Sequence, residues 1–292
     1  MKGLIVKSVS GFYYVKADDR IIECKARGRF RNIGTSPLVG DYVEISLNGE
    51  KGTVEKVFER KNFLDRPPVA NIDKLFIISS AVTPSPNFLL IDRITSLCEF
   101  KNITPVIIFN KSDAGNVSDY TLKYKNIGYI SIECSAKNGS GLDEIKAQMH
   151  GCICAFTGNS GVGKSSILNS IFPELQLSTG EVSEKLGRGR HTTRHTELFY
   201  HKLDGFVADT PGFSSLEADM NNIEFKESLQ YCFPEFRQFD QYCRFSDCKH
   251  IGELGCAVNA AVESGKIDFD RLSSYRIIYD ELKEIKHWNI NK

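Results

Sequence analysis

The first sixty or so residues alternate apolar and polar positions in short runs. Gly, Asp and Asn residues separate the runs, which cover residues 3–9, 11–17, 20–26, 41–47 and 52–58. A period of two, with many β-branched and aromatic side chains, is typical of strands that are buried on one side. Five short strands in this length predict a small β-barrel, of either the OB-like or the SH3-like type.

The pattern changes after the adjacent prolines 67 and 68. Continuous apolar runs now alternate with segments of helical spacing, and these runs cover residues 74–82, 105–109, 129–134 and 152–158. Helices are predicted at 87–102, where Leu90, Ile94, Leu97 and Cys98 share a face, and at 141–149. Buried strands that alternate with helices predict a doubly wound parallel sheet.

From about residue 217 the spacing becomes mostly helical. Residues 221–239 have helical spacing with an interruption at Pro234, and a cysteine-rich loop follows. A helix over 270–288 would place one apolar stripe inward, made of Leu272, Tyr275, Ile278, Tyr279, Leu282 and Ile285. We therefore expect a β-barrel domain at 1–62, an α/β domain at 63–216 and a mostly helical domain at 217–292.

Composition changes this picture little. Apolar residues make up 41% and charged residues 25% of the 292 residues, as in an ordinary globular protein. No signal-peptide core and no apolar span of membrane length occur, so a cytoplasmic protein without a membrane partner is expected. Nine cysteines, an odd number, favour thiols or a metal site over a disulfide framework.

The charge is balanced overall but not locally. Lysine and arginine equal aspartate and glutamate at 37 each, whereas residues 185–196 hold basic residues and no carboxylate. Near the N-terminus, Lys25, Arg27, Arg29 and Arg31 occupy alternate positions, so on a strand they would share one face opposite Phe30. Both a solvated strand edge and an RNA-binding face would have this pattern.

Residues 158–165, GNSGVGKS, match the phosphate-loop pattern G-x-x-x-x-G-K-[ST] between an apolar strand and a probable helix. Backbone N–H groups of such a loop converge on phosphate oxygens at a helix N-terminus. Lys164 would contact the β- and γ-phosphates, and the Ser165 hydroxyl would ligate Mg²⁺. The predicted phosphate-binding residues are Gly158, Asn159, Ser160, Gly161, Val162, Gly163, Lys164, Ser165 and Ser166.

The tetrapeptide NKSD at 110–113 predicts which base is bound. The Asp113 carboxylate would accept hydrogen bonds from N1–H and the exocyclic amine of guanine, a donor pair that adenine lacks. The Lys111 stem would lie along the base, and Asn110 would tie this loop to the phosphate loop. A four-residue motif also fits a chance surface turn, but Ser-Ala-Lys follows the next strand, where an N–H near Ala136 would meet the guanine O6. The predicted guanine-binding residues are Asn110, Lys111, Ser112, Asp113, Ser135, Ala136 and Lys137.

Two further elements follow the phosphate loop. In DTPG, Asp209 would hold Mg²⁺ through water, and the Gly212 N–H would sense the γ-phosphate. A basic loop at 187–195 offers Thr192 or Thr193 as a further Mg²⁺ ligand, and we favour Thr193. The guanine loop thus precedes the phosphate loop, a circular permutation that a parallel sheet tolerates because the site is built at the C-terminal ends of its strands.

Four potential metal ligands lie close together in the C-terminal part. Cys243, Cys248, His250 and Cys256 have the spacing C-x₄-C-x-H-x₅-C. Three thiolates and an imidazole form a closed tetrahedral zinc site of the structural kind. The spacing departs from the commoner C-x₂-C knuckle, so ordinary thiols are the alternative explanation.

The permuted order, with GNSGVGKSS, GRGRHTTR and DTPGF, closely resembles the bacterial GTPases of the RsgA or YjeQ type, which depend on the small ribosomal subunit. The resemblance covers the whole chain. It implies an N-terminal OB domain, a permuted GTPase domain and one structural Zn²⁺ held by the three cysteines and the histidine. It also implies GTP hydrolysis that the small (30S) subunit stimulates during late maturation, and contact with 16S rRNA.

The water-orienting residue differs from that of ordinary G proteins. They place a glutamine directly after D-x-x-G, where this chain has Phe213, which cannot hydrogen-bond water. The resemblance implies that His191 takes this role; contact with the ribosome alone is the other interpretation of that histidine. We expect a monomer that binds GTP and GDP. A nucleotide-regulated interaction protein is the alternative, and Asp113 disfavours an ATP-using enzyme.

Overall fold

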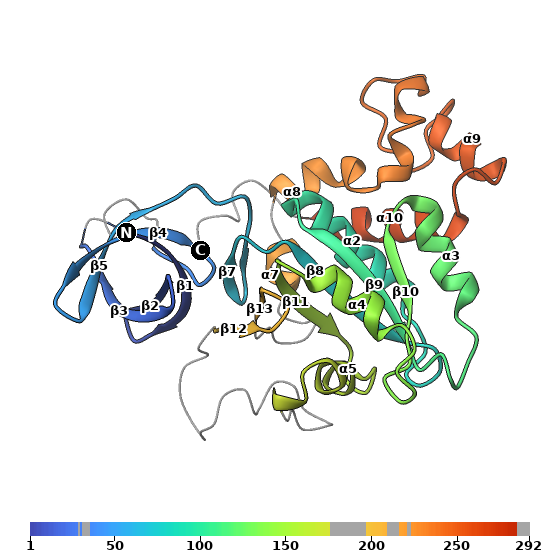
Figure 1. The fold of residues 1–292 in the computed structure, drawn as a ribbon. Coiled ribbons are helices and arrows are strands. Elements are labelled where there is room, and N and C mark those ends of the chain that lie inside the picture. Colours follow the sequence, from blue (N-terminus) through green and yellow to red (C-terminus); the bar gives the residue numbers. More distant parts are fainter. Residues whose placement is uncertain (29, 31–35, 176–196, 209–215, 221–222, 285–292) are drawn as a thin grey trace.

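A computed structural model of the chain describes residues 1–28, 30, 36–175, 197–208, 216–220 and 223–284 (Figure 1). The N-terminal part is a closed barrel in the order β1-β2-β3-β5-β4, with β3 and β5 parallel. Its strands are β1 (Lys2–Val9), β2 (Phe12–Ala17), β3 (Arg20–Ala26), β4 (Tyr42–Asn48) and β5 (Lys51–Val57). The barrel prediction is confirmed, and the strand order is the OB-like alternative.

The basic stretch after β3 does not continue that strand. β3 ends at Ala26, and the Phe30 N–H donates to the Arg27 carbonyl oxygen (3.1 Å), which turns the chain and buries the Phe30 ring. The predicted strand face of four basic residues is therefore wrong. Lys25 is exposed on β3, and Arg27 lies beyond it and pairs with Glu55 (2.8 Å). Arg29 and Arg31 lie outside the described residues.

The central part is a six-stranded sheet in the order β10-β9-β8-β11-β13-β12. Its parallel strands are β8 (Lys74–Ser80), β9 (Thr104–Asn110), β10 (Ile130–Glu133), β11 (Ile153–Gly158) and β13 (Gly205–Ala208). The predicted doubly wound sheet is confirmed. The edge strand β12 (Leu198–His201), antiparallel to β13, was not predicted.

Helices cover both faces of this sheet. Buried side chains of α2 (Phe88–Lys101) and α3 (Ser118–Ile127) pack on one face, and those of α4 (Leu142–Met149) and α5 (Lys164–Ile171) pack on the other. The loops that follow β9, β10 and β11 therefore lie at one edge of the sheet, where a nucleotide site is expected. A hairpin of β6 (Phe63–Asp65) and β7 (Pro68–Ala70) lies between barrel and sheet (Figure 1).

The C-terminal part is helical but more broken than predicted. It contains α7 (Glu217–Met220), α8 (Ile223–Ser228), α9 (Ala257–Glu263) and α10 (Phe269–Leu282). The segment 221–239, predicted to be helical with an interruption at Pro234, is α-helical only as far as Ser228, and 3₁₀ turns at Leu229–Cys232 and Pro234–Phe236 follow. Pro234 begins the second turn and holds Phe233, between the two turns, in an extended conformation. No helix in the described part of the chain is long and apolar enough to cross a membrane.

A buried arginine joins the C-terminal part to the sheet domain. The Arg271 side chain on α10 has no exposed surface. Its guanidinium donates to Asp92 of α2 (2.7 Å) and to Glu235 (2.6 Å), and the Tyr124 hydroxyl of α3 donates to the same Asp92 oxygen (2.8 Å). Because a buried charge must be paired, this contact fixes α10 against α2 and α3.

Candidate functional site

The predicted phosphate loop connects the end of β11 to the start of α5. Gly163 is the residue before α5 and has φ +97°. A Cβ atom there would lie 2.2 Å from Asn110 Nδ2, so only glycine fits. The close approach of backbone to side chain sets the N-terminus of α5 directly beside the guanine loop.

Lys164 and Ser165 begin α5, as the motif requires. The Lys164 ammonium donates to the carbonyl oxygens of Gly158 and Asn159, within its own loop. Burial lowers the pKa of this lysine, because a charged ammonium loses hydration there. A phosphate anion would offset that loss of hydration. Ser165 is buried in the first turn of α5.

Asn110 holds three loops together. At the end of β9 its side chain is only 2% exposed. Its Nδ2 donates to the Val162 carbonyl oxygen in the phosphate loop (2.9 Å), and its Oδ1 accepts from the Ala136 N–H (3.1 Å). The predicted tie to the phosphate loop is present, and a tie to the Ser-Ala-Lys loop adds to it. The Ala136 N–H, which the sequence predicts near the guanine O6, donates its hydrogen bond to Asn110 in this structure.

The groups around Asp113 favour its ionised form, which accepts hydrogen bonds. The Ser135 hydroxyl donates to its Oδ1 (2.6 Å), and Lys137 Nζ lies 3.7 Å from its Oδ2. These contacts, the Ser135 hydrogen bond first, lower the pKa of the carboxyl group. An acceptor that stays ionised near neutral pH suits the two N–H donors of guanine.

Lys111 bridges two loops instead of lying free. It has φ +65°, and its ammonium donates to the carbonyl oxygens of Gly161 (2.7 Å) and Thr83. Thr83, in the loop after β8, was not among the predicted site residues. Its only sequence signal is a proline-containing turn directly after a buried strand.

The predicted catalytic and Mg²⁺ residues of the switch segments lie outside the described residues: His191, Thr192, Thr193, Asp209, Gly212 and Phe213. Their neighbours are placed. β13 ends at Ala208, which pairs with Ala155 of β11, so the chain enters DTPG beside the strand that leads to the phosphate loop. The assignments themselves stay predictions.

The four predicted zinc ligands come together in the C-terminal part. The Sγ atoms of Cys243, Cys248 and Cys256 lie 3.8, 3.6 and 3.4 Å from His250 Nδ1. All four ligand atoms lie within 4.8 Å of one another. Tetrahedral zinc, with bonds of about 2.1 Å to nitrogen and 2.3 Å to sulfur, needs sulfur–nitrogen separations of roughly 3.6 Å. The donor set therefore fits a closed zinc site.

The surroundings of this cluster suit a bound cation. Burial raises the pKa values of the Cys248 and Cys256 thiols and lowers the pKa of His250. Thiolates at this depth need a positive charge beside them, whereas a neutral imidazole is the form that ligates metal. The Glu253 carboxylate accepts hydrogen bonds from the backbone N–H groups of Lys249, Ile251 and Gly252. These bonds fix the path of the loop that carries His250.

Comparison with known proteins gives consistent matches. The family model described as RsgA GTPase matches residues 57–219, and that of the RsgA N-terminal domain matches residues 2–54. The chain is 46% identical to the Small ribosomal subunit biogenesis GTPase RsgA of Bacillus cereus over 292 residues, 98% of each chain. It is also 46% identical to the protein of that name from Clostridium botulinum, over 94% of this chain and 95% of the other.

Two solved structures are similar over nearly the whole chain. YjeQ from Thermotoga maritima has a TM-score of 0.84 and 33% identity, over 98% of this chain and 99% of the other. YloQ, described as a circularly permuted GTPase, has a TM-score of 0.80 and 37% identity, over 98% of this chain and 96% of the other. These matches extend across the barrel, the sheet and the cysteine cluster.

Proposed function

The chain belongs to the RsgA family of GTPases, and we propose that it hydrolyses GTP on the small (30S) ribosomal subunit to promote late maturation and its own release. Relatives that align over nearly the whole chain are named small ribosomal subunit biogenesis GTPases, which supports this role. The working units we propose are an OB-fold RNA-binding domain at 1–62, a permuted GTPase domain at 63–216 and a zinc-binding domain at 217–292.

The observation that carries the nucleotide assignment is the position of Asn110 between the guanine loop and the phosphate loop. With these loops joined, Asp113 can read guanine while the phosphates lie at the N-terminus of α5. The other base-binding residues in this proposal are Lys111, Ser112, Ser135, Ala136 and Lys137, and the phosphates are held by residues 158–166 and Gly212. GTP and GDP are thus the proposed ligands.

Catalysis in this proposal depends on Mg²⁺ and a switch histidine. Ser165, Thr193 and Asp209 would hold Mg²⁺, which neutralises charge between the β- and γ-phosphates. Because Phe213 cannot orient water, His191 would do so once the ribosome positions it. His191→Ala should keep GDP affinity and lose most of the ribosome-stimulated rate. Full stimulated activity in that variant would remove His191 from the mechanism.

The ribosomal contacts are proposed from charge and fold. Lys25 and Arg27 of the barrel, together with Arg29 and Arg31, would contact 16S rRNA. Arg27 pairs with Glu55 in the free protein, so a phosphate would compete with that carboxylate. One Zn²⁺ on Cys243, Cys248, His250 and Cys256 would stabilise the last domain. We propose a cytoplasmic monomer.

A sedimentation experiment tests the partner separately from the chemistry. Purified small subunits are centrifuged with the protein in GTP, in GDP and in a non-hydrolysable GTP analogue. Nucleotide-dependent co-sedimentation with small subunits, and none with large subunits, supports the proposal. Equal co-sedimentation in GTP, GDP and the analogue would favour an interaction protein whose GTP hydrolysis is incidental.

A further inference from the structure

The chain leaves β8 through a short turn, residues 81–84, which lies between the two nucleotide loops. At its start, the Ala81 N–H donates to the Asn110 carbonyl oxygen (2.7 Å) in the guanine loop. At its end, Pro84 Cδ lies 3.7 Å from the position that a Cβ atom on Gly161 of the phosphate loop would occupy. The turn therefore borders both loops, although it carries no residue of either motif.

The carbonyl oxygen of Thr83 in this turn accepts from two donors. One is the Lys111 ammonium, which also donates to the Gly161 carbonyl oxygen (2.7 Å). The other is the Ser80 hydroxyl (3.3 Å), which has no exposed surface and itself accepts from the Val82 N–H (3.4 Å). Because Ser80 closes the turn in this way, its hydroxyl fixes where the Thr83 carbonyl meets the lysine.

The turn also packs tightly against the far end of the guanine loop. A Cβ atom on Gly115 would lie 2.8 Å from Val82 Cγ1, whereas its next neighbours, both atoms of Ala81, would lie at ordinary distances of 3.5 and 3.6 Å. The φ angle of Gly115 is outside the left-handed region, so space rather than backbone conformation requires glycine here. Since Gly115 follows Asp113 by two residues, a displaced turn would displace the guanine acceptor as well.

We propose that residues 80–84 are a positioning element of the nucleotide site, which holds Lys111 and Asp113 where the guanine base binds. Ser80 and Val82 act through these two side chains and do not contact the nucleotide. A lysine side chain is flexible, so fixing it before the base arrives lowers the entropy cost of binding. The inference rests on the proposed nucleotide site and is independent of the proposed ribosomal role.

The first experiment exchanges volume across the contact between Val82 and Gly115. Gly115→Ala should weaken GDP binding about fivefold or more, because a stiff β-branched valine cannot turn aside and the turn must move. Val82→Ala removes the obstructing Cγ1 atom and should bind GDP within about threefold of the native chain. The double variant should bind GDP within about twofold of Val82→Ala, since the space has been restored. Fluorescence titration of the full chain with labelled GDP measures each affinity, and thermal unfolding checks each fold.

The second experiment asks whether Ser80 acts through the Lys111 ammonium. Ser80→Ala loses one hydrogen bond and should weaken GDP binding about threefold to fivefold. Lys111→Met keeps the apolar stem but removes both contacts to carbonyl oxygens, and should weaken it about tenfold or more. Adding Ser80→Ala to Lys111→Met should then cost no more than about 1.5-fold, because residues that act through one contact are not additive. Ser118→Ala, at an exposed serine on α3, is the matched control and should bind normally.

Hydrolysis of GTP by the protein alone separates positioning from a general loss of structure. An element that only helps to bind the base should affect the Michaelis complex and the transition state equally. Ser80→Ala and Gly115→Ala should therefore raise KM for GTP by the factors given for GDP, with kcat within about twofold of the native chain. A general loss of structure would instead lower kcat together with the unfolding temperature.

Rescue of Gly115→Ala by Val82→Ala, and the loss of the Ser80→Ala effect in Lys111→Met, would support the proposal. Gly115→Ala that binds GDP within twofold of the native chain would overturn it, as would a Ser80→Ala effect of equal size with and without the ammonium. If Gly115→Ala does not fold, the Ser80 experiment decides alone. A native chain that does not bind GDP would overturn the nucleotide assignment itself, whereas a native chain that binds GDP while the variants lack these changes would overturn this inference only.

Discussion

Replacing Asn110 by alanine tests whether one side chain assembles the nucleotide site. The change removes the bonds to the Val162 carbonyl (2.9 Å) and the Ala136 N–H (3.1 Å). Each net hydrogen bond is worth about 1 kcal/mol, and a buried partner left unsatisfied adds about 1–3 kcal/mol. Val162 is buried, so its carbonyl has little access to water. The two bonds and the unsatisfied Val162 carbonyl together give a loss of about 3–5 kcal/mol, which is a roughly 100- to 4,000-fold weaker affinity for GDP.

The assay is fluorescence titration with a labelled GDP, alongside thermal unfolding to check the fold. Asn126→Ala, an exposed asparagine on α3, is the matched control and should bind normally. Asn110→Asp keeps the acceptor for Ala136 but places a carboxylate oxygen against the Val162 carbonyl, so it should bind at least as weakly. If folded Asn110→Ala bound GDP within threefold of the native chain, the reasoning about loop assembly would be wrong.

The remaining predictions concern the metal site, the domain contact and the guanine acceptor. Cys248→Ser should lose the single zinc measured by metal analysis, while Cys152→Ser, outside the cluster, should keep it; a native chain purified without zinc would contradict the site. Arg271→Met leaves the buried Asp92 and the half-buried Glu235 without their cation and should lower stability by about 3–5 kcal/mol in urea unfolding, and an unchanged midpoint would oppose this view. Ser135→Ala removes the hydrogen bond that lowers the pKa of Asp113, so NMR titration should find that pKa raised toward its ordinary 3.8. In the native chain, the lowered pKa of Asp113 in the folded state adds folding stability above its ordinary pKa, and this stability is lost as the pH falls through the folded-state pKa. Because Ser135→Ala raises the folded-state pKa, the variant should lose the contribution at a higher pH.

Much of the fold followed from local patterns. Alternation predicted the barrel, and continuous apolar runs predicted the parallel strands, because a strand buried on both faces has no polar side. The four-residue strand β12 was too short to show a period. The alternating basic positions predict that the strand continues past Ala26, whereas β3 ends there because Phe30 turns back and is buried, which is a tertiary effect.

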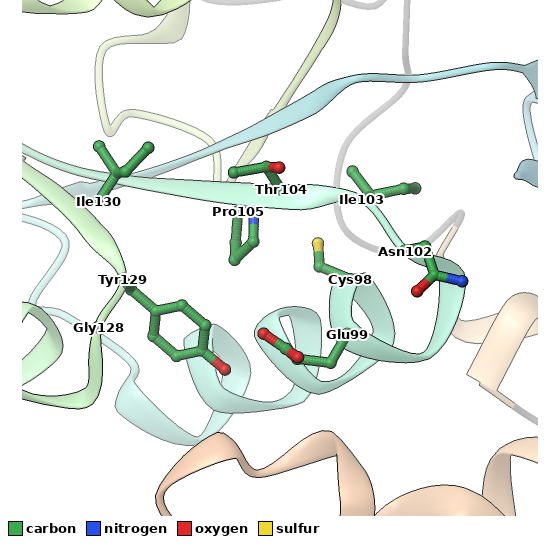
Figure 2. Close-up of a pocket in the computed structure, with 9 residues that line it drawn as sticks. All are labelled: Cys98, Glu99, Asn102, Ile103, Thr104, Pro105, Gly128, Tyr129 and Ile130. Atoms are coloured by element: carbon green, nitrogen blue, oxygen red, sulfur yellow. The ribbon is translucent and has the colours of Figure 1, made fainter. Parts of the chain in front are cut away.

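The candidate site was predictable where a motif fixes neighbouring residues. The four ligands of the cysteine cluster converge as their spacing predicted, and the metal itself stays a proposal. The contact between Lys111 and Thr83 joins loops 28 positions apart, and no local pattern encodes it. The same holds for the cavity of about 450 Å³ that the end of α2 forms with the starts of β9 and β10 (Figure 2).

Action on the small ribosomal subunit is what we propose for this GTPase. The most direct measurement is the steady-state rate of GTP hydrolysis alone, with purified 30S subunits, with 50S subunits and with free ribosomal RNA. We expect slow hydrolysis by the protein alone, because Phe213 replaces the water-orienting glutamine, and strong stimulation by 30S subunits only. An unchanged rate with 30S subunits, or equal stimulation by 50S subunits or free RNA, would contradict it.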